Sequence, residues 1–218
     1  MNKSRENHSN RANATQRKSD SQTAPIRLNR APKRQMKPGN MLNPVPVVMV
    51  SCGNTPDEYN IITVAWCGTV CSDPAMCYIS VRPERHSYPI IQESQEFVIN
   101  LVSNELAERA DWCGVRSGKK FNKFIETDLT PIRGKMVQAP LIYEAPVNLE
   151  CKVKQIIPLG SHDMFIAEIV AVHASELLFD KKTGEMHLER ANLVSYSNGH
   201  YYNLGKIIGK FGFSVQKK

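Results

Sequence analysis

The feature that most constrains the fold is a pair of long segments in the second half of the chain, residues 147–159 and 162–176. In the first, VNLECKVKQIIPL, one face carries Leu149, Cys151, Val153 and Gln155, and the other carries Glu150, Lys152 and Lys154. A period of two is typical of a β-strand with one face on the core and the other toward solvent. Gly160 and Ser161 separate the two segments, so we predict that they form a β-hairpin.

Shorter apolar runs rich in β-branched residues precede this hairpin, and turn-forming residues separate them. We expect strands in residues 44–52, 60–70, 75–81 and 96–102. Helical segments are few and short: residues 88–95, residues 104–114 with Asn104 as a suitable N-cap, and residues 119–129. Many short strands with few helices indicate a mainly β protein built as an antiparallel barrel, not a parallel α/β sheet.

The positive charge of the chain lies at its N-terminus. Residues 1–34 hold nine Lys and Arg against two acidic residues, while the rest is balanced, so the tail accounts for the whole net charge of +7. The tail has few large apolar residues and cannot bury enough surface to offset the entropy of ordering its backbone. We therefore predict a disordered basic tail over residues 1–34 and one folded domain over residues 35–218.

No segment has the continuous apolar stretch of a signal peptide or a membrane span, so we expect a cytoplasmic protein. The six cysteines form no C-x-x-C pair, and several lie inside apolar runs. We interpret them as small hydrophobic residues in a reducing compartment and expect no metal site. They are Cys52, Cys67, Cys71, Cys77, Cys113 and Cys151.

Two stretches could bind a ligand. In NIITVAW, residues 60–66, polar side chains and free backbone groups could recognise the edge of a flat heteroaromatic ring, and Trp66 could form an apolar wall; an edge strand with a buried Trp is the alternative. In SVRPERHSY, residues 80–88, Arg82 and Arg85 present guanidinium groups that match a phosphate, next to a possible helix N-terminus at Ser87. A solvated arginine loop is the alternative here.

Two further features are weaker. Residues 111–124, DWCGVRSGKKFNKF, contain two glycines and three lysines and could close over a ligand as a flap, or could simply link two helices. His162 titrates near neutrality and could take part in proton or hydride chemistry, although a single His at the start of a strand is more often structural.

Taken together, these motifs resemble the flavin reductase-like, FMN-binding split-barrel family, and in particular its flavoredoxin branch. The resemblance spans roughly residues 37–215. It rests on the order and spacing of NPVPVVMVSC, NIITVAWCGTVCSDPAMCYISVRPERHSYPII, EFVINL, DWCGVRSGKKFNKF, PLGSHDMFIAEIVAVH and YYNLGKIIGKFGFSV.

The resemblance implies a six-stranded Greek-key split β-barrel, usually a homodimer with FMN near the subunit interface. It implies that residues 60–66 line the flavin ring, that Arg85 and Ser87 hold the phosphate, and that residues 113–118 cover the cofactor. His162 resembles a histidine near the nicotinamide side, although relatives often carry GDH where this chain has GSH. The implied cofactor-binding residues are Asn60, Thr63, Val64, Ala65, Trp66, Cys67, Ser80, Val81, Arg82, Arg85, His86, Ser87, Asn100, Leu101, Cys113, Gly114, Ser117 and Gly118.

Three functions follow as hypotheses. The first is an FMN-dependent oxidoreductase that passes electrons from NAD(P)H to free flavin, ferric iron or a redox protein. The second is a flavoredoxin-type electron carrier that binds FMN but does not oxidise NAD(P)H directly. The third, a nucleic-acid or surface-binding protein driven by the tail, is disfavoured, and we expect neither nucleic acid nor membrane as a partner.

Overall fold

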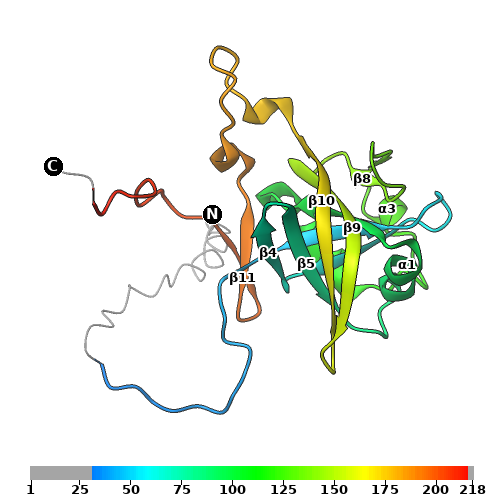
Figure 1. Cartoon of the computed structure of the whole chain (residues 1–218), viewed down its shortest axis with the longest axis horizontal. Helices are drawn as coiled ribbons and strands as arrows, with labels where there is room; N and C mark the ends of the chain where they lie inside the picture. The colour runs from blue at the N-terminus through cyan, green and yellow to red at the C-terminus, as the bar shows by residue number, and fades with distance from the viewer. Residues whose placement is uncertain (1–30, 216–218) are drawn as a thin grey trace, which may run out of the picture. The chain divides into compact units, whose positions relative to one another are not determined.

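The structure is a computed structural model that describes residues 31–215 (Figure 1). The chain divides into two units, Met1–Gly39 and Asn40–Lys218. Within the first unit, residues 31–39 are exposed and contain no helix or strand. The predicted disordered tail therefore lies outside the described residues except at 31–34. All described helices and strands belong to the second unit.

A seven-stranded antiparallel sheet forms the body of the second unit, in the order β3-β2-β6-β9-β10-β5-β4. The mainly β split-barrel prediction is confirmed, with seven strands in this sheet where six were expected. Residues 60–70 form two strands instead of one, because the chain leaves the sheet at Ala65 and Trp66. The strands are β2 (Val48–Cys52), β3 (Asn60–Val64), β4 (Cys67–Ser72), β5 (Ala75–Val81), β6 (Glu96–Leu101), β9 (Val147–Pro158) and β10 (Asp163–Ala174).

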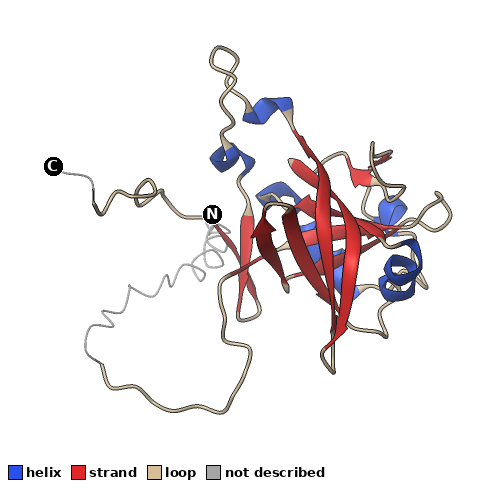
Figure 2. Ribbon diagram, in the orientation of Figure 1, coloured by secondary structure: helices blue, strands red, loops and turns tan. Residues whose placement is uncertain are grey.

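The long hairpin of β9 and β10 has the predicted turn and supplies the two longest strands, which lie in the middle of the sheet (Figure 1). Two small sheets accompany it, one of β1 (Val45–Pro46), β11 (Val194–Ser197) and β12 (His200–Asn203), the other of β7 (Pro131–Ile132) and β8 (Leu141–Ile142). Figure 2 shows how few residues are helical. The helices are α1 (Ser87–Ser94), α2 (Ala107–Val115), α3 (Lys123–Glu126) and the 3-10 turns η1 (Asn104–Leu106), η2 (Glu176–Leu178) and η3 (Leu188–Ala191).

The helix predictions were right in place, and only the segment 119–129 was predicted too long. The segment 104–114 begins as a 3-10 turn, and Ser103 occupies the N-cap position in place of Asn104, without a side-chain capping bond. In the segment 119–129, only the four residues of α3 are helical. The side chain of Asn122 caps α3 by accepting a hydrogen bond from the N–H of Ile125.

Apolar side chains fill two main cores. One lies inside the barrel and includes Val50, Ile79, Phe97 and Phe165; the other lies where α2 and α3 cover β2 and β3. Five of the six cysteines are buried, and burial raises the pKa of the Cys52 and Cys67 thiols to about 12. These thiols are therefore un-ionised near pH 7 and pack as small hydrophobic groups.

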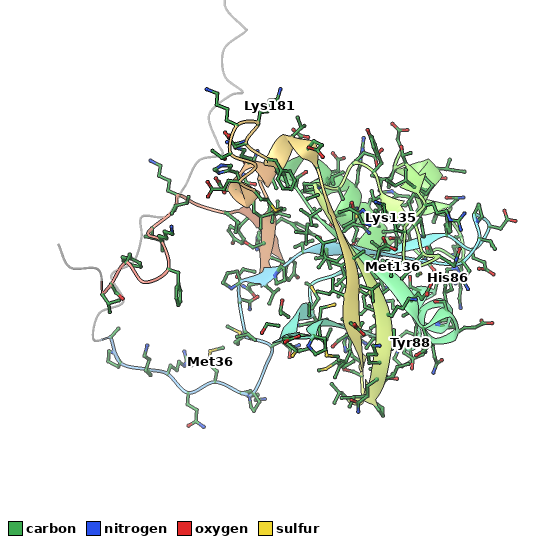
Figure 3. All side chains as sticks on the ribbon, turned by 45° about the horizontal axis from the view of Figure 1, so that its top comes forward. Met36, His86, Tyr88, Lys135, Met136 and Lys181 are labelled. Atoms are coloured by element: carbon green, nitrogen blue, oxygen red, sulfur yellow. The ribbon has the colours of Figure 1, made fainter. Side chains whose placement is uncertain are left out.

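The solvent-facing prediction for β9 is wrong at Glu150, which is completely buried. Its carboxylate accepts hydrogen bonds from the N–H groups of Lys135 (2.9 Å), Met136 (2.6 Å) and Val137 (2.8 Å), and Nε2 of His173 lies 2.5 Å from Oε1. Lys135 and Met136 are labelled in Figure 3. The cause is the segment before β8, which covers the second face of the sheet at this point.

No helix within residues 31–215 is both long and apolar enough to cross a membrane. In the same range, no group of three or more His, Cys, Asp or Glu side chains is placed to hold a metal ion.

Candidate functional site

A cavity of about 440 Å³ lies where the two ends of the main sheet approach each other. Because β3 and β4 are the terminal strands of this sheet, each has one edge without a strand partner in the described sheet. Ala65 and Trp66 connect the two edges, and the carbonyl of Trp66 accepts a hydrogen bond from the N–H of Ser80 (2.9 Å). The junction therefore offers backbone donors and acceptors to a ligand in the cavity.

The loop between β5 and α1 supplies the positive charge of the cavity. Arg82 and Arg85 both line it, and Arg82 forms an exposed ion pair with Glu84 (3.4 Å). Two guanidinium groups in one wall form a suitable donor set for a phosphate. Both arginines of the stretch predicted to bind an anion therefore lie at the cavity.

An aromatic pair forms the next part of the wall. The ring of Trp66 meets the imidazole of His162 edge to face, with centroids 4.9 Å apart. Burial, together with nearby Arg82, lowers the pKa of His162, and Glu84 opposes this only in part. The hydroxyl of Ser161 lies 3.0 Å from Nδ1, which fixes the orientation of the imidazole. Burial and Arg82 therefore favour the neutral form of the His162 imidazole.

The opposite wall comes from α2 and from the β11–β12 hairpin. Asp111, Gly114 and Val115 face the cavity from the helix, and Tyr196 and Tyr201 face it from the hairpin. The hydroxyl of Tyr201 donates to Oδ1 of Asp111 (2.8 Å), so one hydrogen bond joins the hairpin to α2. Burial raises the pKa of Tyr201, and the Asp111 carboxylate raises it further.

The structure brings ten of the predicted site residues to the cavity. They are Thr63, Val64, Ala65, Trp66, Ser80, Val81, Arg82, Arg85, Gly114 and His162. The Thr63 hydroxyl already donates to the carbonyl of Ala110, so it can offer a ligand only its lone pairs. The other nine predicted residues lie outside the lining.

Four of those nine lie around the N-terminus of α1. Nδ2 of Asn60 donates to the buried hydroxyl of Ser87 (2.7 Å). Gly118 packs so closely that an added Cβ would lie 2.3 Å from Oδ1 of Asn60 and 2.6 Å from Cδ2 of His86. This glycine permits a close approach, which differs from the flexible flap expected for this loop. His86 is labelled in Figure 3.

The remaining five have separate places. Asn100 is buried in a polar network: it donates to the Met49 carbonyl (2.9 Å) and the Ser51 hydroxyl (2.9 Å), and accepts from the Ile142 N–H (2.9 Å). Cys67 and Cys113 belong to the cores, Leu101 packs against them, and Ser117 is exposed.

A buried lysine that was not predicted links two walls of the cavity. Nζ of Lys123 donates to the carbonyl of Ile61 in β3 (2.7 Å) and to that of Cys113 in α2 (2.5 Å). Burial lowers the pKa of Lys123 to about 8. The sequence showed it only as one of several lysines in a polar loop.

The β11–β12 side of the lining was also missed. It contributes Tyr196, Asn198, Gly199 and Tyr201. Asn198 and Gly199 both have positive φ, 47° and 85°, as a tight hairpin turn requires. The Asn-Gly pair between tyrosines was the available signal.

These observations define the class of protein. A sequence profile for the flavin reductase like domain matches residues 41–205, and the chain belongs to this family. The donor set also suits the ligand that the family resemblance implies: two guanidinium groups for a phosphate, free sheet-edge backbone for a polar ring edge, and an aromatic wall.

One relative and two solved structures show how similar this chain is to other proteins. An uncharacterized protein of Archaeoglobus fulgidus is 31% identical over 126 residues, which cover 58% of this chain and 71% of the relative. The solved structure of flavoredoxin of Desulfovibrio vulgaris (Miyazaki F) is 28% identical with a TM-score of 0.77, and the match covers 84% of this chain and 100% of that one. The FMN-binding protein from Thermus thermophilus, at 21% identity and a TM-score of 0.65 over 79% of this chain and 94% of its own, shares the fold. The predicted family, with its flavoredoxin branch, is confirmed.

Proposed function

We propose that the chain binds FMN in this cavity and acts as an oxidoreductase that passes electrons from NAD(P)H to an acceptor such as free flavin, ferric iron or a redox protein. The observation that carries the proposal is the meeting of three features in one cavity of about 440 Å³: the free backbone between β3 and β4, the Trp66 wall, and the Arg82 and Arg85 pair. A phosphorylated planar heteroaromatic molecule needs all three.

In this proposal each wall has a separate task. Arg82 and Arg85 hold the phosphate by charge-assisted hydrogen bonds, and the backbone of residues 63–66 orients the polar edge of the ring. Val64 and Val115 present apolar surface against which the ring can pack. In the chain without ligand, burial and Arg82 lower the pKa of His162 and favour its neutral form. When bound, FMN supplies the hydride and electron chemistry.

A second candidate is a flavoredoxin-type electron carrier that uses the same site and is reduced by another redox protein. It is favoured by the match to flavoredoxin over 100% of that protein's length at 28% identity. Both candidates predict a yellow protein, and they differ only in the electron donor.

An anaerobic titration of the FMN-loaded protein separates them. If NADH or NADPH bleaches the flavin absorbance within the mixing time of the experiment, the first candidate holds. If neither nucleotide does so and dithionite does, the carrier is correct. A colourless protein that takes up no added FMN would refute both. The homodimer and the cytoplasmic location stay predictions.

A further inference from the structure

A hydrogen bond between Tyr88 and Asp163 joins two parts of the chain that are far apart in the sequence and lie next to the cavity. The hydroxyl of Tyr88, in the first turn of α1, donates to Oδ2 of Asp163, the first residue of β10, at 2.5 Å. Both side chains are partly buried, and Tyr88 is labelled in Figure 3. Neither residue lines the cavity, so any effect of this bond on a ligand passes through its neighbours.

The Asp163 end of this bond leads to the His162 wall of the cavity. Asp163 follows His162 directly in the chain and pairs with Val81 across β10 and β5. His162 and Val81 both line the cavity. In the part of the chain that the structure describes, the Asp163 carboxylate forms no ion pair and has Tyr88 as its one side-chain hydrogen-bond partner. Tyr88 is therefore the side chain that fixes this carboxylate.

The Tyr88 end leads to residues 82–85, which we call the arginine loop. The N–H of Tyr88 donates to the carbonyl of Arg85 (3.0 Å), and the N–H of Arg85 donates to the carbonyl of Arg82 (3.0 Å). Two successive backbone hydrogen bonds therefore connect Tyr88 to both arginines of the cavity. Its hydroxyl then ties the arginine loop to the start of β10.

The ring of Tyr88 is held in its orientation by the barrel core. It meets the ring of Phe165 edge to face, with centroids 5.3 Å apart, and Phe165 is completely buried. The hydrogen bond to Asp163, followed by burial, raises the pKa of Tyr88, so the hydroxyl keeps its proton near neutral pH. Because carboxylate acceptors make stronger hydrogen bonds than neutral ones, this contact is suited to hold two segments together.

We propose that Tyr88 and Asp163 are positioning residues that hold the arginine loop at a fixed separation from the His162 wall. The inference rests on the proposed function for the identity of the ligand.

A fixed arginine loop determines which flavin the cavity prefers. The backbone of residues 63–66 orients the ring, so the phosphate meets the guanidinium groups only if they lie at the correct distance from that backbone. Riboflavin has no phosphate and gains nothing from this placement. The bond between Tyr88 and Asp163 therefore contributes to the preference for FMN over riboflavin.

Flavin titrations of the Tyr88→Phe variant test this role. The substitution removes one oxygen atom and keeps the ring on Phe165. We expect FMN to bind about tenfold more weakly, the effect of about one lost hydrogen bond, and riboflavin to bind as in the wild type. As a matched control, Tyr143→Phe changes a tyrosine that is 69% exposed and does not line the cavity, and it should alter neither affinity. Equal losses for both flavins, or no loss, would overturn the proposal.

A double-mutant cycle shows whether Tyr88 acts through the arginines. In a background with Arg82→Met and Arg85→Met, Tyr88→Phe should weaken FMN binding by less than about twofold further. Asp163→Asn keeps an acceptor oxygen and should lose less FMN affinity than Asp163→Ala. A full tenfold loss in the background without the two arginines, or unchanged FMN binding in Asp163→Ala, would contradict the positioning role.

A measurement without flavin separates this inference from the proposed function. Burial lowers the pKa of His162, and the arginine loop acts on it through Arg82, which lowers it, Glu84, which raises it, and Arg85, which lowers it. The loop therefore lowers this pKa only while it is held close to the imidazole.

NMR titration of the ligand-free full chain reads this pKa directly, with the signal assigned from His162→Gln. Tyr88→Phe should move the pKa of His162 toward its ordinary value of 6.5, and the control Tyr143→Phe should not. An unchanged pKa in Tyr88→Phe would refute the positioning role. A wild type that binds neither flavin, with the shift present in Tyr88→Phe, would refute the proposed function and support the positioning role.

Discussion

Replacing the buried Glu150 by Gln should destabilise the fold without touching the cavity. The carboxylate accepts three backbone hydrogen bonds, from residues 135, 136 and 137, and pairs with His173. A Gln amide has one acceptor oxygen in place of two, so at least one N–H would face an amide N–H₂ group. We therefore expect the loop before β8 to lose its attachment to β9.

The size of the effect follows from these contacts. A hydrogen bond to a charged group contributes about 1.5–3 kcal/mol, and a donor left unsatisfied by burial adds to the loss. Because Gln keeps the shape and some of the bonds, we expect a loss of about 3 kcal/mol in the free energy of unfolding, below the upper range of about 5 kcal/mol for breaking a buried pair. For a chain of this size that lowers Tm by roughly 6–12 °C.

Urea unfolding followed by circular dichroism gives the measurement. The matched control is Glu168→Gln in the neighbouring strand β10, which removes a partly exposed ion pair with Lys154 (2.7 Å) and should change stability by less than about 1 kcal/mol. If Glu150→Gln and Glu168→Gln lose equal stability, the carboxylate does not anchor the loop.

The pH dependence gives an independent check. Burial acts to raise the pKa of Glu150, but the three N–H donors and His173 outweigh it, so the pKa lies below the usual 4.5. The wild-type advantage over Glu150→Gln should therefore be complete above about pH 4.5 and disappear as the pH falls through the lower, folded-state pKa.

Three further variants test the site. The folded-state pKa of Lys123, about 8, lies below the ordinary 10.5, so between pH 8 and 10.5 the unfolded chain binds more protons and the wild type gains about 3 kcal/mol of stability. Lys123→Met should remove this gain, as measured by urea titrations across that pH range. Parallel pH profiles of the two proteins would argue against this. Arg85→Met should weaken FMN binding about 10–100-fold in fluorescence titrations and riboflavin binding little, since only FMN carries the phosphate; equal losses would remove Arg85 from that role. Gly118→Ala should lower Tm by several degrees by displacing Asn60, whereas Gly205→Ala, with no atom within 4 Å of its added Cβ, should not; equal Tm values would mean that the loop shifts freely.

Much of the fold could be predicted from local sequence, because a β-branched run between turn residues specifies a strand almost by itself. Residues 75–81 became β5 with the same bounds, and the hairpin turned at Gly160 and Ser161 as expected. The period-two pattern of residues 147–159 could not show that a separate segment covers Glu150. Whether another segment buries the outer face of a strand depends on the path of the whole chain.

The cavity, too, could be predicted only where its lining residues are consecutive in the sequence. The consecutive residues 63–66 and 80–85 were found because the motif and the wall coincide along the chain. Tyr196 and Tyr201 were not, because they reach the cavity only through the pairing of β11 with β1, which joins Tyr196 to Val45. Asn60 and Ser87 show the converse: their polar groups satisfy each other, and no local pattern distinguishes that pairing from a ligand contact.

The two free strand edges at the cavity have a consequence for aggregation. Sheet edges usually avoid pairing with other molecules through charged residues or proline, and neither β3 (NIITV) nor β4 (CGTVCS) contains either. For β3, protection comes from its position instead, under α2 and α3, where Lys123 ties strand and helix together. A variant that releases this cover would expose an uncharged, β-prone edge, so damage to this wall should appear as insoluble protein before it appears as lost activity.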